Sequence, residues 1–216
     1  MIDLFLRAAP MLAEAVWITL FLGLGSFALG CMLGLLVALA RMSSLRVLRW
    51  LAFAYVSVFR GTPLLIQLLL IYFGLPAYGI IIDPISASLL ALTLFAAAYL
   101  SENFRSGISA VDRGQWEAAW SMGMPYATVL RRVILPQALR VAVPPMGSRL
   151  VALMKDTSLA STVTVVELTR VADQVGASTF RYMEIFLIVG AIYWAINQVL
   201  TILQTMLENR LARRYQ

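Results

Sequence analysis

The chain has 216 residues, 61% of them hydrophobic and only 13% charged, and its mean hydropathy is +0.84. This composition is too apolar for an ordinary soluble domain and predicts an all-α protein that crosses a membrane several times. We attribute the net charge of +6 to loop arginines that orient the spans, and not to a nucleic-acid partner. Histidine is absent, which excludes His-based metal sites and Ser-His or Cys-His pairs, so neither a metal nor a cofactor is expected.

Five apolar stretches are expected to span the bilayer, because roughly 20 residues cross about 30 Å of hydrocarbon. They cover residues 16–40, 51–73, 85–100, 141–166 and 184–207. Arginines gather after the first span, between the third and fourth spans, and after the fifth. This pattern predicts a multi-pass protein of the cell inner (plasma) membrane, with the N-terminus outside and the C-terminus in the cytoplasm. Residues 1–216 are expected to form a single transmembrane domain.

The second and third predicted spans each contain a charged interruption. In the second span Pro63 disfavours helical geometry at Thr62, which predicts a kink or a new helix start. Arg60 beside it either reaches the headgroups or serves as a gate or dimer contact, and both hypotheses stay open. In the third span Glu102 is either functional or paired with Arg105, one helical turn further on.

The fourth predicted span is the least regular. Pro144-Pro145 opens it, and Arg149, Lys155 and Asp156 lie at depths where charge is rare. Either the segment is a broken helix that lines an aqueous cavity, or its charges neutralise one another between packed helices. We favour the cavity, because Asp156-Thr157-Ser158 is also a helix-start signal and non-helical backbone at membrane depth is tolerated where it lines water or substrate. The polar residues 167–183 are expected to form an external connection.

Residues 117–136, with the sequence EAAWSMGMPYATVLRRVILP, form a polar, arginine-bearing island between the apolar runs. A short helical turn is expected at its start and should end at Gly123. Pro125 suits the first position of a second short helix, and Pro136 should break or kink the helix that follows. Helical spacing puts an apolar row on one face and two arginines on the other. The row is Tyr126, Val129, Leu130, Val133 and Ile134, and the arginines are Arg131 and Arg132. The alternative is an amphipathic hairpin that lies on the bilayer.

The island has an ordered pattern: Glu-Ala-Ala, three residues, Gly, nine residues, a branched aliphatic, one residue, Leu-Pro. This pattern resembles the loop by which permease subunits of ABC importers dock on their ATPase. The stretches FRGTPLLIQLLLIYFGLP, MKDTSLAS and VVELTR extend the resemblance over nearly the whole chain, to the polar amino-acid subfamily. Within it the chain is most similar to cystine-type permeases, at IYFGLPAYGI and DRGQWEAA.

The resemblance implies a type I ABC importer permease fold, with a cytosolic coupling helix in a loop at 106–140. It implies ATP-driven import of a polar amino acid, with cystine as the favoured substrate. The implied partners are a dimer of cytosolic ABC ATPases, a periplasmic or lipoprotein solute-binding protein, and a second permease subunit, expected as a homodimer. The chain itself is not expected to be an enzyme, because it has no Gly-rich loop ending in Gly-Lys-Ser/Thr. An ion channel and a non-transporting scaffold subunit are the alternatives.

The resemblance also implies roles for individual residues. Contact with the amino acid is implied for Glu102, Asp156, Thr157 and Ser158. Two neighbours, Ser101 and Asn103, depart from the family pattern. The residues expected to couple to the ATPase are Glu117, Ala118, Ala119, Gly123, Tyr126, Val129, Leu130, Arg131 and Pro136.

Overall fold

The computed structural model describes residues 1–213, and every regular element in that part of the chain is helical, as predicted. The α-helices are α1 (Ile2–Arg41), α2 (Arg46–Gly61), α3 (Leu64–Leu69), α4 (Pro84–Ser109), α5 (Arg113–Ser121), α6 (Tyr126–Val129), α7 (Leu135–Asp156), α8 (Leu168–Thr179) and α9 (Tyr182–Arg213). Two π-helical turns, η1 (Leu70–Gly74) and η3 (Leu130–Ile134), and two 3₁₀ segments, η2 (Leu75–Tyr78) and η4 (Thr157–Val163), complete the described chain.

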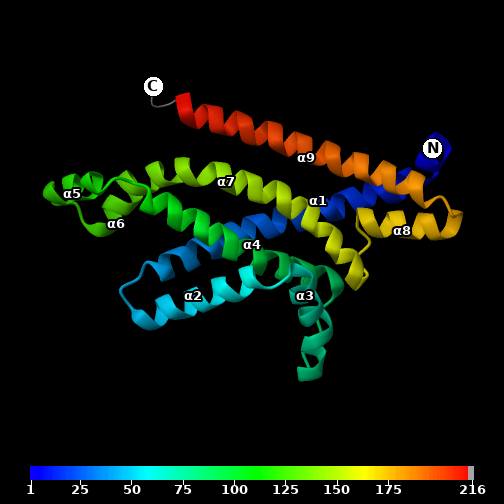
Figure 1. Cartoon of the computed structure of the whole chain (residues 1–216), viewed down its shortest axis with the longest axis horizontal. Coiled ribbons are helices and arrows are strands. Elements are labelled where there is room, and N and C mark those ends of the chain that lie inside the picture. The colour runs from blue at the N-terminus through cyan, green and yellow to red at the C-terminus, as the bar shows by residue number, and fades with distance from the viewer. Residues whose placement is uncertain (214–216) are drawn as a thin grey trace.

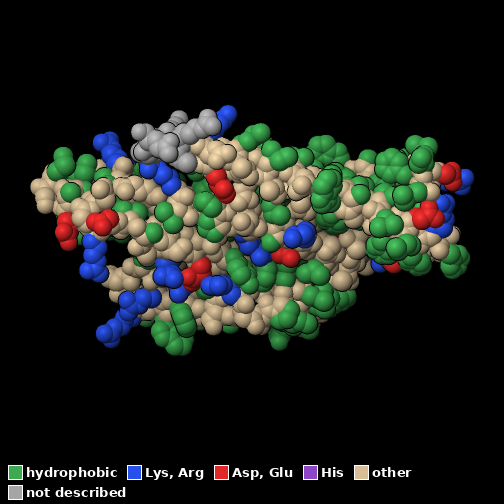
Figure 2. All heavy atoms as spheres, turned by 45° about the horizontal axis from the view of Figure 1, so that its top comes forward, with side chains coloured by type: hydrophobic (Ala, Val, Ile, Leu, Met, Phe, Trp, Pro, Cys, Tyr) green, Lys and Arg blue, Asp and Glu red, His purple; other side chains and the backbone are tan. Residues whose placement is uncertain are grey.

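The long helices α1, α4, α7 and α9 run along one elongated bundle, from which α3 projects (Figure 1). The α1–α2 turn, the α5–α6 hairpin and the C-terminal end of α9 lie at one end of the bundle. The N-terminus and α8 lie at the other end. Many of the Lys and Arg side chains on the surface in Figure 2 lie at or near the α5–α6 end. The three basic segments that the sequence predicts for one side of the membrane therefore share one end of the molecule.

The predicted number of about five spans is roughly matched. Three helices are long and apolar enough to cross a membrane, namely α1, α4 and α9. α2 and the segment Leu64–Tyr78 pass the same test together, as one span that is bent by 108°. The remaining candidate is α7, whose 22 residues are enough to cross the hydrocarbon but include four charged side chains.

The first helix is longer than the predicted span, because its early turns have their own partners. α1 has 40 residues and is about 60 Å long. Its first turns bury a row of small and aliphatic side chains against α8 and α9. The row is Leu4, Ala8, Leu12 and Ala15. Spacings of three and four residues keep this row on one face of the helix, so the first turns of α1 are packed against neighbours and are part of the same helix as the predicted span.

Residues 167–183, predicted as a plain external connection, contain the amphipathic helix α8. Leu168, Val171, Ala172 and Val175 have the spacing of one helix face, and that face is buried against α1 and α9. Pro144-Pro145, predicted to open the fourth span, lies inside α7. The helix had already begun at Leu135, with Pro136 in its first turn, where no backbone N–H is needed.

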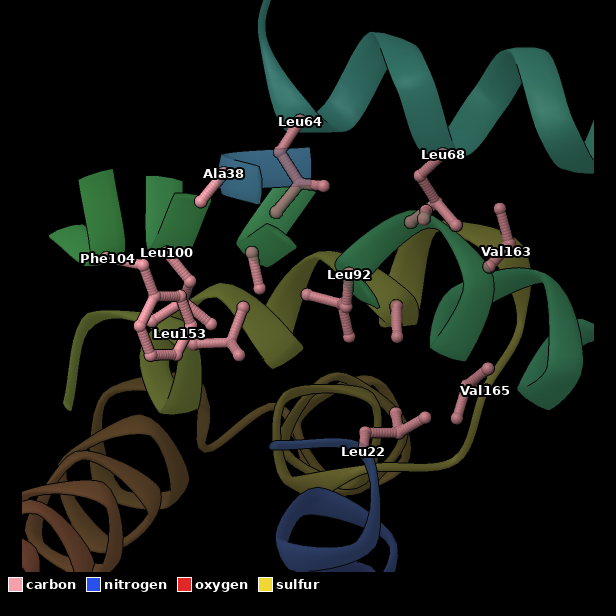
Figure 3. Packing of buried hydrophobic residues seen from close by; sticks show 13 residues of the cluster. Leu22, Ala38, Leu64, Leu68, Leu92, Leu100, Phe104, Leu153, Val163 and Val165 are labelled. Carbon is pink, nitrogen blue, oxygen red and sulfur yellow. The ribbon is translucent and has the colours of Figure 1, made fainter. Parts of the chain in front are cut away.

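The central core joins helices that are far apart in the sequence. Leu22 of α1, Leu100 of α4 and Leu153 of α7 are fully buried there, and Leu64 and Leu68 of α3 pack on the same cluster (Figure 3). The short helix α3 is therefore anchored in the core, although the chain bends sharply to reach it.

Close helix contact near the α5–α6 end depends on Gly107. A β-carbon at this residue would lie 2.6 Å from the carbonyl oxygen of Ala138 on α7, which is too close for the two backbones to stay in place. We predict that Gly107→Ala lowers the stability of the folded protein by about 1–3 kcal/mol, the usual cost of overpacking. Thermal unfolding in lipid nanodiscs measures this change.

Gly190 is the matched control, because a β-carbon there meets nothing within 4 Å. Gly190→Ala should leave stability unchanged or raise it by about 0.5–1 kcal/mol, since alanine favours a helix interior. Equal effects of the two substitutions would contradict the close α4–α7 contact.

Candidate functional site

A single carboxylate, Glu102, gathers three guanidinium groups from three helices. Arg105 Nη2 lies 2.8 Å from Glu102 Oε2, one turn along α4, as the sequence suggested. Arg41 from the end of α1 pairs with Oε1 of the same carboxylate, and Arg60 Nη1 from the end of α2 lies 3.9 Å from it. These contacts connect α1, α2 and α4 at one point. Arg60 therefore has a partner inside the bundle, and its role as a gate or dimer contact stays a prediction.

The aromatic ring of Tyr99 joins this cluster to the fourth predicted span. The guanidinium carbon of Arg60 lies 5.1 Å from the Tyr99 ring centre, and that of Arg149 lies 4.6 Å from it. Arg149 also lies 4.7 Å from the ring centre of Phe95. Guanidinium groups at these distances are attracted by the π-electrons of a ring. Tyr99 on α4 therefore contacts cations from α2 and α7.

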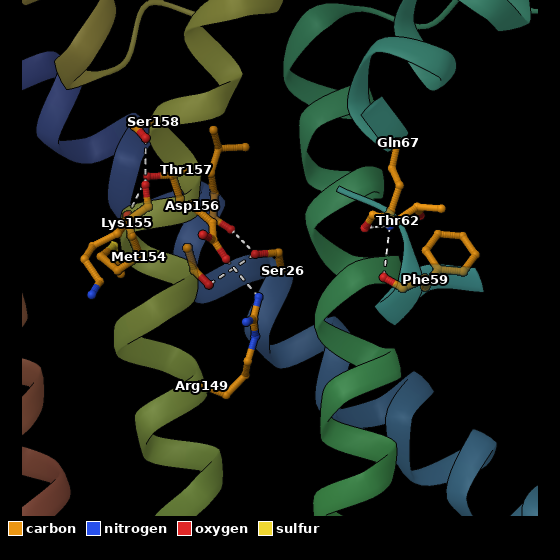
Figure 4. Close-up of polar contacts among 12 residues, drawn as sticks. Ser26, Phe59, Thr62, Gln67, Arg149, Met154, Lys155, Asp156, Thr157 and Ser158 are labelled. Atoms are coloured by element: carbon orange, nitrogen blue, oxygen red, sulfur yellow. Dashed lines mark hydrogen bonds and ion pairs between the residues drawn. The ribbon is translucent and has the colours of Figure 1, made fainter. Parts of the chain in front are cut away.

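Arg149 and Asp156 pair with each other at the end of α7. Arg149 Nη2 donates to Asp156 Oδ2 at 2.9 Å (Figure 4). α7 ends at Asp156 and the chain continues as the 3₁₀ segment η4, so the α-helix ends at the predicted helix-start signal, although the Asp156 side chain does not cap η4. The charges also neutralise each other within α7. The end of the α-helix agrees with the first hypothesis and the ion pair with the second, while the lining of an aqueous cavity by this segment stays a prediction.

Thr157 and Ser158 follow directly but use their hydroxyl groups locally. Thr157 Oγ1 is buried and donates to Met154 O at 2.8 Å, and Ser158 Oγ donates to Lys155 O at 2.8 Å (Figure 4). The structure thus brings Asp156, Thr157 and Ser158 together. Glu102 lies in a separate cluster.

The linked clusters carry more positive than negative charge. Arg41, Arg60, Arg105 and Arg149 face only two carboxylates, those of Glu102 and Asp156. A cavity of about 420 Å³ opens beside Glu102, between α1, α2 and α4. Arg41, Arg60 and Tyr99 line it together with Phe53 and Ser57. This volume is within the range of small-molecule sites.

The predicted coupling segment forms a helical hairpin. Asp112 Oδ1 accepts from Gly114 N and caps α5, which ends before Gly123 at a left-handed φ of +73°. The predicted stop at Gly123 is therefore confirmed. Pro125 caps α6 from outside and is not its first residue, and Pro136 lies in the first turn of α7, where it causes no break.

The predicted coupling residues divide into buried and exposed groups. Val129 is fully buried and Ala119 nearly so, in a small core with Ile108, Ile134 and Ala138. Leu130 is half-buried. The exposed members are Glu117, Ala118, Gly123, Tyr126, Arg131 and Pro136. A partner can therefore touch the second group, while Ala119 and Val129 hold the hairpin together.

Comparison with known proteins identifies the family. Residues 30–213 match the family described as binding-protein-dependent transport system inner membrane component. The chain belongs to this family. The L-cystine transport system permease protein TcyB of Bacillus subtilis is 43% identical over 205 residues, which cover 94% of this chain and 88% of TcyB. The arginine transport system permease protein ArtQ of B. subtilis is 39% identical over 203 residues, covering 94% and 93%.

Solved structures agree with this assignment. A crystallised amino acid ABC transporter with histidines matches with a TM-score of 0.89 and 38% identity, covering 95% of this chain and 96% of its own. The predicted type I permease fold and the resemblance to amino-acid permeases are thus confirmed. The protein is a permease subunit of an ABC amino-acid importer, which favours transport over the channel and scaffold alternatives.

Two features of this permease were missed from its sequence. Trp116, Trp120 and Tyr126 form an aromatic row on the hairpin, with ring centres 5.7 and 6.0 Å apart. The large apolar residues that flank Ala119 in a polar loop were the signal for this row.

Glu167 is fully buried, and its oxygens accept from the backbone N–H groups of Thr169 and Arg170 and from the Tyr193 hydroxyl at 2.7 Å. No local pattern around Glu167 predicts the contact with α9.

The Glu102 cluster yields a stability prediction. Glu102→Gln removes the charge that balances three guanidiniums, so we expect a loss of about 2 kcal/mol, in the range for hydrogen bonds to charged groups. Asp173→Asn is the control, because its carboxylate is exposed and lies 3.6 Å from Arg170. A surface pair of this kind contributes about 0–1 kcal/mol. Thermal unfolding of the two variants should differ clearly, and equal melting temperatures would contradict a stabilising role for Glu102 as the shared partner of the three arginines.

Proposed function

We propose that this subunit carries a polar amino acid, with cystine as the favoured substrate, from the exterior or periplasm to the cytoplasm. ATP hydrolysis on separate cytosolic subunits drives the movement. The observation that carries the proposal is the exposed α5–α6 hairpin, held by its own core between α4 and α7. A hairpin built in this way offers a partner a firm contact at one end of the bundle.

The position of the hairpin explains how a push would reach the path of the substrate. α4 enters the hairpin and carries Tyr99 and Glu102, and α7 leaves it and carries Arg149 and Asp156. The Glu102 and Arg149–Asp156 clusters, linked by Tyr99, are called the charged cluster below. The two helices meet closely at Gly107. Displacement of the hairpin therefore moves both helices of the charged cluster together, since packed helices move as rigid bodies.

Glu102, Asp156, Thr157 and Ser158 are proposed as residues on the amino-acid path. Because Arg41, Arg105 and Arg149 already occupy the two carboxylates, the site as a whole favours substrate carboxylates over cationic side chains. Cystine suits this balance, as it carries two carboxylates as well as two ammonium groups. The L-cystine relative supports the same substrate, whereas the arginine relative supports a cation.

The proposed assembly contains two permease subunits, expected to be identical, a dimer of ABC ATPases and an external solute-binding protein. The N-terminus lies outside and the C-terminus in the cytoplasm. Two features support this orientation: the basic α1–α2 turn and the arginines of the hairpin lie at the same end of the bundle (Figure 1). The whole of residues 1–216 serves as one permease domain, with residues 106–140 as its coupling loop.

Docking of the ATPase is tested at Gly123. Gly123→Asp places a side chain at a left-handed φ of +73°, which distorts the turn between α5 and α6. We expect normal membrane insertion but loss of the ATPase on co-purification. Gly79→Asp is the matched control, since Gly79 has a φ of +79° and equally open surroundings but lies far from the hairpin. Retention of the ATPase by Gly123→Asp would contradict the docking assignment.

Substrate choice is tested by competition. Uptake of labelled cystine into proteoliposomes that hold the permease, its ATPase and its binding protein should be blocked by unlabelled cystine. Arginine and histidine should compete more weakly, because the cluster does not offer a free carboxylate to a cationic side chain. Glutamine should also compete more weakly, because it has one carboxylate where cystine has two. Stronger competition by arginine than by cystine would contradict the substrate assignment.

A further inference from the structure

The second span is broken between α2 and α3, and the angle of the break needs an explanation. Thr62 (φ −118°, ψ 147°) and Pro63 (φ −62°, ψ 136°) are extended, and the chain direction bends by 108° between the helical segments on either side. Pro63 prevents the helix from continuing through Thr62. A proline alone does not fix the angle at which two helical segments meet.

Side chains from the break and beyond it supply donors to the end of α2. The last turn of a helix leaves carbonyl groups without backbone partners. Thr62 Oγ1 donates to Val58 O at 2.8 Å. Gln67 Nε2 lies 3.0 Å from Phe59 O, 3.1 Å from Thr62 O and 2.9 Å from Thr62 Oγ1 (Figure 4). Because Gln67 belongs to α3, its amide ties α3 to the end of α2.

Packing alone does not explain why residue 67 is a glutamine. Its side chain is buried, and among the described residues its Oε1 atom has no hydrogen-bond partner. An unpaired amide oxygen in a buried place is unfavourable. Leucine has a similar size and would pack at this position without that penalty. The benefit of glutamine here therefore lies in the hydrogen bonds that its NH₂ group donates.

The turn that Gln67 holds also carries Arg60. Phe59, whose carbonyl accepts from Gln67, directly precedes Arg60. The Arg60 guanidinium reaches the Tyr99 ring and the Glu102 carboxylate from this turn. We propose that Gln67 is a positioning residue: its amide fixes the angle of the break, and through that angle it fixes the place of Arg60 in the charged cluster.

The geometric part of the proposal is tested without transport. Spin labels on Leu51 and Tyr78, both exposed and on opposite sides of the break, report the angle as a distance by double electron–electron resonance. The full chain is used in lipid nanodiscs, with Cys31→Ala to remove the native thiol. Gln67→Leu should broaden and shift the distance distribution. An unchanged distribution would overturn the proposal.

Two further variants distinguish the loss of the Gln67 donors from a general effect of substitution or misfolding. Gln174→Leu removes an exposed glutamine on α8 and should leave the distances unchanged. Gln67→Glu cannot donate when ionised but regains one donor when protonated. Its distribution should be broad at alkaline pH and narrow reversibly on acidification of the same sample, while Gln67→Leu stays broad. Misfolding does not produce this reversal, and its absence would count against the role of the NH₂ donors.

The effect on transport rests on the proposed function and has its own test. If Gln67 acts through Arg60, Gln67→Leu should raise the KM for uptake when Arg60 is present. When Arg60 has already been replaced in Arg60→Met, adding Gln67→Leu should leave the KM unchanged. Independent, additive effects of the two substitutions would overturn the action through Arg60. Failure of every version to import an amino acid would instead contradict the proposed function and leave the distance measurements standing.

Discussion

The structure depends on one constraint, which is that charges inside a membrane protein must find partners. Glu102 meets this constraint for guanidiniums of α1, α2 and α4, and the Tyr99 ring extends the network to Arg149 on α7. Charges at membrane depth are costly alone, so these contacts favour arrangements of the four helices that keep the network intact. The same contacts that hold the bundle together thus lie in the region that we propose as the substrate path.

The coupling that we propose depends on where this network lies in the chain. The helices that carry Tyr99, Glu102, Arg149 and Asp156 are the two that enter and leave the α5–α6 hairpin. The hairpin in turn has a small core around Val129, so it is a firm extension of the two helices and not a loose loop. A soluble partner that moves the hairpin therefore acts on the charged cluster through short and well-packed connections.

Features set by local chemistry were predictable from sequence. Pro63 predicted the break in the second span, and Gly123 predicted the end of α5, because each residue restricts its own backbone. Contacts between distant residues were not predictable. Nothing near Glu102 in the sequence indicates that Arg41, 61 positions earlier, pairs with its carboxylate. The polar residues of 167–183 led to the prediction of a plain connection, and the apolar face that α8 buries was overlooked. The candidate site residues were therefore proposed by resemblance. The local pair of Glu102 and Arg105 was a sequence prediction, whereas the contacts of Glu102 with Arg41 and Arg60 required the fold.

The central claim is that the α5–α6 hairpin faces the cytoplasm and that an ATPase binds it there. Met122, exposed at the tip beside Gly123, gives the most direct test as Met122→Cys in a Cys31→Ala background. A membrane-impermeant maleimide should label this cysteine in inside-out vesicles, and the cognate ATPase should protect it. Labelling only from the outer face, or labelling that the ATPase leaves unchanged, would contradict the account.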